Sequence, residues 1–408
     1  MRWVCERERR RPKAKQGRAS AASDVYKRQA GRGIEIAEVA ARKIDKVRAV
    51  GGSEMKIVAN PMDVVNNPNI DIVVEVIGGT TLAKDLVLQA ISNGKHVVTA
   101  NKALLAEFGN EIFAAAHAKG VMVAFEGAVA VSIPIIKALR EGLSGNRIEW
   151  VAGIINGTTN FILTEMRDKG LSFDAALKDA QRLGYAEADP TFDIEGMDAA
   201  HKATILSSIA FGIPVQFGKA YVEGITKLDA IDIAYAFQLG YRIKLLGITK
   251  RTAKGIELRS HPTLIPVKRL LASVEGSMNG IMVKSDAAGI TMYYGAGAGS
   301  EQTASAVIAD LVDVTRLHTA DPAHRVPHLA FQPNAMSDLQ VLPMSDIVTS
   351  YYLRLRVADE AGVLAKVTGI LANAGISIDA VLQREADEVG GEGSTQTDVI
   401  ILTHDCVE

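Results

Sequence analysis

The stretch from Leu183 to Ile205 combines several acidic residues with one lysine, and reads LGYAEADPTFDIEGMDAAHKATI. The pattern predicts a helix from about Met197, in which Asp198 and Lys202 are one turn apart and share a face. That helix is apolar nearly all round, so we expect it to be buried together with its two charges. A buried lysine next to a carboxylate could protonate an alkoxide, since burial lowers and carboxylates raise the pKa of an ammonium.

A structural ion pair is the competing interpretation of Asp198 and Lys202. The loop before them carries more carboxylates than one lysine can neutralise: Glu187, Asp189, Asp193 and Glu195. This excess favours a site for a cationic group of a ligand. Pro190 keeps the residue before it out of helical conformation, so these acids should precede the helix on a loop.

Strand and helix patterns alternate from Ile34 onward, which predicts βαβ units and a Rossmann-like, doubly wound α/β sheet. The predicted strands are IEIAEVA, IDIVVEVIGG and HVVTANKAL, and helices are expected at 82–92 and 104–119. In such a sheet ligands bind at the carboxyl ends of the strands, here the Gly78 turn and the turn from Thr99 to Lys102. Both turns could line a dinucleotide, although glycines at strand ends are also ordinary turn residues.

Residues 1–29 are rich in arginine and lysine and have neither apolar periodicity nor the hydrophobic region of a signal peptide. They predict a disordered, non-native-looking leader, with a basic nucleic-acid arm as the alternative. No G-x-G-x-x-G precedes Ile34, although a dinucleotide-binding fold should open with a strand, that loop and a helix. We therefore expect the first βα unit to be absent, leaving a gap between the strands that begin at Ile34 and Ile70.

A strand, a tight turn and a helix are predicted in EWVAGIINGTTNFILTEMRDKG, with Asn156 and Thr158 in the turn. We expect Thr159 or Asn160 to cap the helix. The turn either caps that helix and does no more, or presents donors and backbone amides to a substrate. Before it, Glu126 and the carbonyl groups that follow could hold a hard cation, because such ions take oxygen ligands.

The composition is that of a globular chain with small-molecule partners. Its 408 residues are 48% hydrophobic, which predicts two or three domains with sizeable cores. A net charge of −2 argues against nucleic acid or an anionic membrane as partner. The longest apolar run, Ala128 to Ile136, is far short of the ~20 residues of a membrane span. Cys5 and Cys406 lie at opposite ends, which indicates a reducing, cytoplasmic compartment.

The segments AGIINGTTNFIL, LGYAEADPTFDIEGMDAAHKATIL, VVTANKAL and YYGAGAGSEQTASAVIADL together resemble the bacterial, regulated type of homoserine dehydrogenase. The resemblance extends from about Ala30 to Glu408. It implies interconversion of L-aspartate 4-semialdehyde and L-homoserine with a nicotinamide cofactor, in threonine, methionine and isoleucine biosynthesis. Because the glycine-rich loop is not found, a non-catalytic amino-acid-binding relative without its cofactor is the alternative.

The resemblance also assigns roles to single residues. It makes Lys202 the catalytic proton donor and acceptor, and Asp198 the residue that holds this lysine. The substrate positions that it implies, together with the turn described above, are Glu187, Asp193, Lys102 and Thr158. The expected cofactor positions are Lys102, Gly78, Thr99, Asn101, Gly184 and the Gly295, Gly297 and Gly299 loop. The family's sodium site maps onto Glu126 and the carbonyls of Val129, Val131 and Ile133.

The stretch after the first predicted strand favours NADP over NAD. It reads Ala40, Ala41, Arg42 and Lys43, with no acid where a ribose 2′-hydroxyl would be bound. Arg42 can pair with the 2′-phosphate of NADP. A solvated basic turn is the alternative interpretation of Arg42.

We expect a nucleotide-binding domain at 30–130 and 300–318, and an α+β substrate and dimerisation domain at 131–299. Between Leu245 and Tyr294 the pattern predicts short strands and a helix at 267–274. A helix at 303–314 should return the chain to the nucleotide domain. Residues 319–349 are interpreted as a linker.

The segment from 350 to 408 resembles an ACT domain, a ferredoxin-like module that binds amino acids between paired copies. Its pattern is strand, turn, helix, strand and strand, so we expect an incomplete domain that lacks the second helix and the fourth strand. Asp359 and Gly362 match its ligand loop. The resemblance implies an amino-acid effector, expected to be threonine, and a homodimer or homotetramer; a plain structural appendage is the alternative.

Overall fold

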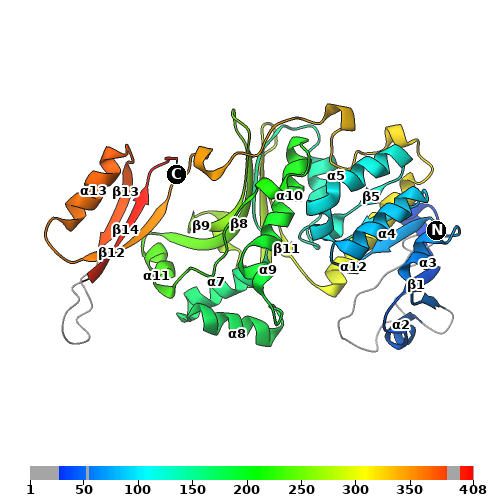
Figure 1. The fold of residues 1–408 in the computed structure, drawn as a ribbon, viewed down its shortest axis with the longest axis horizontal. Coiled ribbons are helices and arrows are strands. Elements are labelled where there is room, and N and C mark those ends of the chain that lie inside the picture. The colour runs from blue at the N-terminus through cyan, green and yellow to red at the C-terminus, as the bar shows by residue number, and fades with distance from the viewer. Residues whose placement is uncertain (1–26, 52–54, 384–395, 408) are drawn as a thin grey trace.

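The computed structural model describes residues 27–51, 55–383 and 396–407. They form three parts in a row, with the N-terminal part, where nucleotide binding is expected, at one end and a small C-terminal sheet at the other (Figure 1). The predicted leader lies outside the described residues except for 27–29. No helix in the described ranges is both long and apolar enough to cross a membrane.

Parallel strands and helices alternate in the N-terminal part, as predicted. Its elements are β1 Glu38–Ala40, α2 Ile44–Gly51, β2 Lys56–Val58, α3 Pro61–Asn66, β3 Ile72–Glu75, α4 Thr81–Ser92, β4 His96–Thr99, α5 Lys102–Lys119 and β5 Val123–Ala124. The first strand is shorter than the pattern at Ile34 suggests, because only its last residues pair with β2.

The described strands of this part form two separate parallel sheets, β1-β2 and β3-β4-β5. The predicted gap is therefore present among the described strands: the strand after Ile34 lies in one sheet and the strand after Ile70 in the other. Asn101 begins α5 by accepting the Leu104 N–H at 3.1 Å, and Gly120 ends it in left-handed conformation with φ 63°. Both helix ends are thus set by the local sequence.

The central part is a six-stranded sheet of order β11-β10-β6-β8-β9-β7, with helices against it. Only β7 and β9 pair in parallel. The elements are α6 Ile135–Lys137, a π-helical turn Ala138–Gly142, β6 Ile148–Ile154, α7 Gly157–Lys169, α8 Phe173–Leu183, α9 Thr191–Ile194, α10 Met197–Phe211, β7 Tyr221–Val222, α11 Ala230–Gln238, β8 Tyr241–Arg251, β9 Ile256–Pro266, β10 Met278–Ser285 and β11 Gly289–Ala296.

Two local predictions for this sheet are wrong. The strands are long, with 11 residues each in β8 and β9, where the sequence suggested short ones. Pro262 interrupts the local pattern, but continuous pairing with β8 carries β9 through it. The helix expected at 267–274 is only a short 3-10 helix, Leu270–Ser273.

Helix α10 is buried, as predicted, and every residue from Asp198 to Phe211 is enclosed. It packs on β6, β8 and β9 and also on α5 of the nucleotide-binding part. After β11 the chain returns to β4 and β5 through α12 (Ser300–Leu317), which confirms the predicted return helix. The site residues on α10 therefore lie where the two parts meet.

The C-terminal part has β12 Tyr352–Ala358, α13 Val363–Asn373, β13 Ile378–Gln383 and β14 Gln396–Thr403, with antiparallel order β12-β14-β13. It docks on the beginning of α11 through β12. Arg354 binds Asp232 and Asp229, each at 2.7 Å, and the Tyr352 hydroxyl donates to Asp232 at 2.8 Å. The stretch 319–349 between the parts holds only short 3-10 helices and isolated bridges.

Candidate active site

Lys202 points from the first turns of α10 toward the end of β6. Its ammonium donates to Asp198 Oδ2 and to the carbonyl oxygen of Ile155, both at 2.7 Å. These two bonds leave one N–H of the ammonium without an acceptor among the described residues. The side chain is only 10% exposed, so this N–H is held in a fixed direction inside the protein. Such a group is prepared to give a proton to an oxygen atom placed beside it.

Asp198 lies between two lysines that come from different parts of the molecule. Its Oδ1 forms an ion pair with Lys102 at 3.0 Å, and its Oδ2 accepts from Lys202 at 2.7 Å. Lys102 begins α5, and its side chain is 33% exposed, three times more than that of Lys202. The structure thus brings together the predicted pair and the lysine at the expected boundary of cofactor and substrate.

Asn156 joins this pair to the acidic loop. Its amide nitrogen donates to Asp198 Oδ2 at 2.9 Å and to Asp193 Oδ1 at 2.7 Å, while its side-chain oxygen caps α7 through the Thr159 N–H. The Thr158 hydroxyl lies within hydrogen-bond distance of Asp193 Oδ2 and of a backbone carbonyl. The predicted cap, Thr159 or Asn160, is therefore wrong: the cap is Asn156, about one turn earlier and two residues after the end of β6.

The charges of the site perturb one another. Burial opposes ionisation of Asp198, but the attraction of Lys202 and Lys102 is stronger and lowers the pKa of this carboxyl well below its usual value. Burial, with repulsion from Lys102, lowers the pKa of Lys202. Burial and the nearby Asp198 raise the pKa of Asp193. A cationic group of a ligand beside Asp193 would relieve that repulsion.

Glu187 is exposed on the loop between α8 and α9, and its carbonyl accepts from Gln181 at 3.1 Å. Its exposed position places it at the rim of the acidic loop. Gly184, expected on the cofactor side, ends α8 in left-handed conformation with φ 81° and is exposed. Arg42 is exposed just after β1.

The two predicted turns at the carboxyl ends of β3 and β4 lie side by side. The Asn101 amide donates to the Gly79 carbonyl at 2.7 Å, and the Thr99 hydroxyl donates to Glu75 at 2.7 Å. The Gly78 N–H also reaches Glu75, at 3.2 Å. The side chains of Thr99 and Asn101 are thus bound within the protein, and contact with a cofactor would fall to the backbone of these turns.

Glu126, the predicted cation ligand, caps α6. Its Oε1 accepts the Ile136 N–H at 2.9 Å and its Oε2 the Lys137 N–H at 3.0 Å. Each oxygen keeps a lone pair, and the adjoining turn bends sharply at Ala130, with φ 52°. No cluster of three or more His, Cys, Asp or Glu side chains exists in the described part of the chain, so a cation there would depend on backbone carbonyls.

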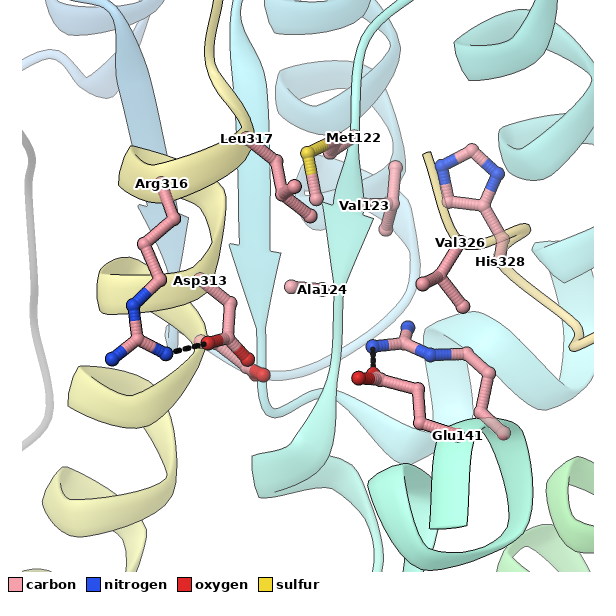
Figure 2. Close-up of a pocket in the computed structure, with 11 residues that line it drawn as sticks. Met122, Val123, Ala124, Glu141, Asp313, Arg316, Leu317, Val326 and His328 are labelled. Atoms are coloured by element: carbon pink, nitrogen blue, oxygen red, sulfur yellow. Dashed lines mark hydrogen bonds and ion pairs between the residues drawn. The ribbon is translucent and has the colours of Figure 1, made fainter. Parts of the chain in front are cut away.

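A cavity of about 250 Å³ lies away from Lys202, between β5, α12 and the π-helical turn (Figure 2). Its charged residues are largely paired with each other: Arg316 binds Asp313 at 3.1 Å and Arg140 binds Glu141 at 2.8 Å. Asp310 lines it and accepts the Glu126 N–H at 2.8 Å. Burial, with the nearby Glu126, raises the pKa of Asp310 to about 7. None of the predicted catalytic or substrate residues lines this cavity.

Comparison with known proteins agrees with this arrangement. The family model described as homoserine dehydrogenase matches residues 134–312, the model described as its NAD-binding domain matches 19–126, and an ACT domain model matches 351–405. The NAD-binding match begins inside the stretch interpreted as a leader.

Close relatives and solved structures carry the same name. The homoserine dehydrogenase of Pseudomonas aeruginosa is 61% identical over 93% of this chain and 86% of its own length. That of Neisseria gonorrhoeae is 56% identical over 95% of this chain and 87% of its own length. A crystal structure of a homoserine dehydrogenase from Thiobacillus denitrificans matches with a TM-score of 0.90 and 64% identity, over 95% of this chain and 88% of that one.

Proposed function

This chain belongs to the homoserine dehydrogenase family, and we propose that Lys202 is the residue that exchanges a proton with the substrate. Members of this family are oxidoreductases that interconvert L-aspartate 4-semialdehyde and L-homoserine. The match to the family's NAD-binding domain favours this function over a binding protein without a cofactor. Oxidation of NADPH on addition of L-aspartate 4-semialdehyde is the assay, and complete inactivity of the purified chain would refute the function.

The geometry of the ammonium is the observation that carries the mechanism. In the direction of reduction, the bound nicotinamide nucleotide supplies a hydride to the aldehyde carbon. The carbonyl π electrons move to oxygen, and the remaining N–H of Lys202 gives its proton to that oxygen. The product is a primary alcohol, and Lys202 is left neutral until it is reprotonated. In the reverse direction the neutral amine accepts the hydroxyl proton.

Asp198 holds Lys202 in place and keeps its proton available. As an ionised neighbour at 2.7 Å, it raises the pKa of the lysine against the lowering effect of burial. Lys102 shares the same carboxylate from the other side and is more exposed. We propose that Lys102 lies at the boundary between cofactor and substrate, and that the turns at Gly78, Thr99 and Asn101 approach the nucleotide with their backbone.

The acidic loop supports binding of the substrate's ammonium group. Asp193 is held by Asn156 and Thr158, and its raised pKa means that a cation beside it would be stabilising. We place the ammonium between Asp193 and the rim residue Glu187.

Substitution of Glu187 by alanine should therefore weaken substrate binding more than turnover. Loss of a charged partner for an ammonium predicts a KM for L-homoserine about 10-fold higher, with kcat within about threefold of native. Glu107→Ala, which removes an exposed carboxylate from α5, is the matched control. Steady-state kinetics with both variants decides the role, and an unchanged KM in Glu187→Ala would contradict it.

NADP is the cofactor that we propose, on the basis of Arg42 and the absence of an acid between Ala40 and Lys43. A guanidinium there would pair with the 2′-phosphate, which NAD lacks. The expected result is a higher kcat/KM with NADPH than with NADH, and a smaller difference in Arg42→Ala. A tenfold preference of the native chain for NADH would overturn this proposal.

The ACT domain indicates regulation by an amino acid, and we propose threonine as the effector, with Asp359 and Gly362 on its loop. Its docking on α11 supports communication with the site, since α11 packs against α7, and α7 carries Asn156 and Thr158 at its beginning. We further propose assembly as a dimer or tetramer, and sodium held by Glu126 with the carbonyls of Val129, Val131 and Ile133. The cation has no part in the proton transfer.

A further inference from the structure

Asn279 is a buried amide without a hydrogen-bond partner. It is 0% exposed, and among the residues that the structure describes neither its Nδ2 nor its Oδ1 has a hydrogen-bond partner. Buried amides are nearly always paired, because an unpaired donor or acceptor is destabilising. Asn160 shows the usual situation nearby: it is 1% exposed, donates to the carbonyls of Val274 and Met278, and accepts from Lys244. The unpaired amide of Asn279 therefore needs a reason.

The position of Asn279 in the sheet puts it close to the catalytic lysine. It lies on β10 on the same face as Ile281 and Val283, which belong to the core that includes α10. The pairing of Gly280 with Ile154, continued by one residue, sets Asn279 opposite Ile155. The carbonyl of Ile155 is the acceptor that holds Lys202. A Cβ on Gly157, at the beginning of α7, would be 3.7 Å from the Asn279 oxygen.

The backbone of Gly297 lies against this amide. A Cβ added to Gly297 would be 2.0 Å from the Asn279 nitrogen and 2.4 Å from its oxygen, so a side chain there would have to displace the amide. Peptide groups of the loop at 297–299 are thus next to the amide but not aligned with it for hydrogen bonds. The loop joins β11 to α12, so it connects the central sheet to the nucleotide-binding part.

The residue before this loop, Ala296, is hydrogen-bonded to Ser132, which lies in the other segment that connects the same two parts. Ser132 donates from its hydroxyl to the carbonyl of Ala296 at 2.7 Å, and its N–H reaches the same oxygen at 3.3 Å. If the two parts moved relative to each other, the backbone of the 297–299 loop beside Asn279 would therefore move as well.

We propose that Asn279 is a positioning residue for the cofactor: its carboxamide hydrogen-bonds to the backbone of the 297–299 loop when that loop closes on the bound nicotinamide nucleotide. The inference rests on the proposed function and on the family resemblance, which implies that the loop with Gly295, Gly297 and Gly299 lies on the cofactor side. Without cofactor the amide remains unpaired and destabilises the protein. With cofactor it holds the loop over the nicotinamide end of the nucleotide, near Lys202.

Substitution by alanine separates this role from ordinary packing. In the full chain without ligand, Asn279→Ala should keep its Tm within about 1 °C of native or raise it, because it removes two unpaired groups. The same change at Asn160, whose amide is fully paired, should lower the Tm by about 4 °C or more. Calorimetric titration with NADPH should give a Kd at least ~10-fold higher for Asn279→Ala than for the native chain.

Two results would overturn the proposal. One is a loss of Tm in Asn279→Ala as large as that in Asn160→Ala, which would mean that the amide is paired and structural. The other is equal affinity of native and Asn279→Ala chains for NADPH, which would refute the role of this residue and leave the proposed function intact. A native chain that does not bind NADPH at all would instead refute the proposed function, and this inference with it.

Discussion

Lys202→Ala should reduce turnover of L-homoserine on the order of 100-fold or more, with little change in KM. The alanine removes the group that we propose exchanges the proton, whereas Asp193 and Thr158, which we expect to bind the substrate, keep their contacts with Asn156 and each other. Since Lys202 is held by Asp198 and Ile155 rather than by the substrate, its loss should appear in kcat.

The control for this prediction is Lys178→Ala, which removes an exposed lysine from α8. It should leave both kcat and KM near native values. Removal of Lys202 leaves the buried Asp198 with Lys102 as its remaining cation, which could destabilise the protein. Thermal unfolding of both variants therefore checks that they are folded. Near-normal turnover in Lys202→Ala would disprove the assignment.

The second large effect concerns the cofactor. A chimeric chain in which residues 1–29 are replaced by a strand, a G-x-G-x-x-G loop and a helix should bind NADPH at least ~100-fold more tightly, a gain of about 2.7 kcal/mol. The reason is that such a unit pairs with interior strands on both sides and directs a helix N-terminus at the pyrophosphate. Among the described strands, β1-β2 and β3-β4-β5 are not joined, and the new strand would join them.

This prediction is checked by titrating NADPH into the two chains and following heat or intrinsic fluorescence. A chimera whose glycines are replaced by alanine is the control, and it should lose most of the gain because the backbone could no longer approach the phosphates. Equal, micromolar affinity of the original chain and the chimera would refute the prediction.

The central helix of the site could be predicted from the sequence because its signals are local. Asp198 and Lys202 are one turn apart, and the residues around them are apolar, so a buried pair on one face followed directly. The βαβ units and the C-terminal strands could likewise be predicted, because strand and helix patterns alternate along the sequence. These features depend on neighbours within a few residues.

Contacts between distant segments could not be predicted in this way. Lys102 reaches Asp198 from another part of the molecule, and only the packing of α5 on α10 brings them together. The sequence predicts that Asn156 lies in a turn, but its bridge from Asp193 to Asp198 depends on the loop before α10. Asn279 gave no signal at all, because an asparagine in a strand pattern does not reveal whether its amide is paired.

The most direct test of the central claim, that Lys202 transfers a proton, is chemical rescue of Lys202→Ala. Methylammonium should enter the space left by the side chain and restore reduction of L-aspartate 4-semialdehyde at least ~10-fold. The rescued rate should follow the protonated fraction of the amine, because reduction requires a proton donor. Tetramethylammonium carries the same charge but has no proton to give, and it should have no effect. Equal stimulation by both cations would show that Lys202 supplies only charge, and would contradict proton transfer by this residue.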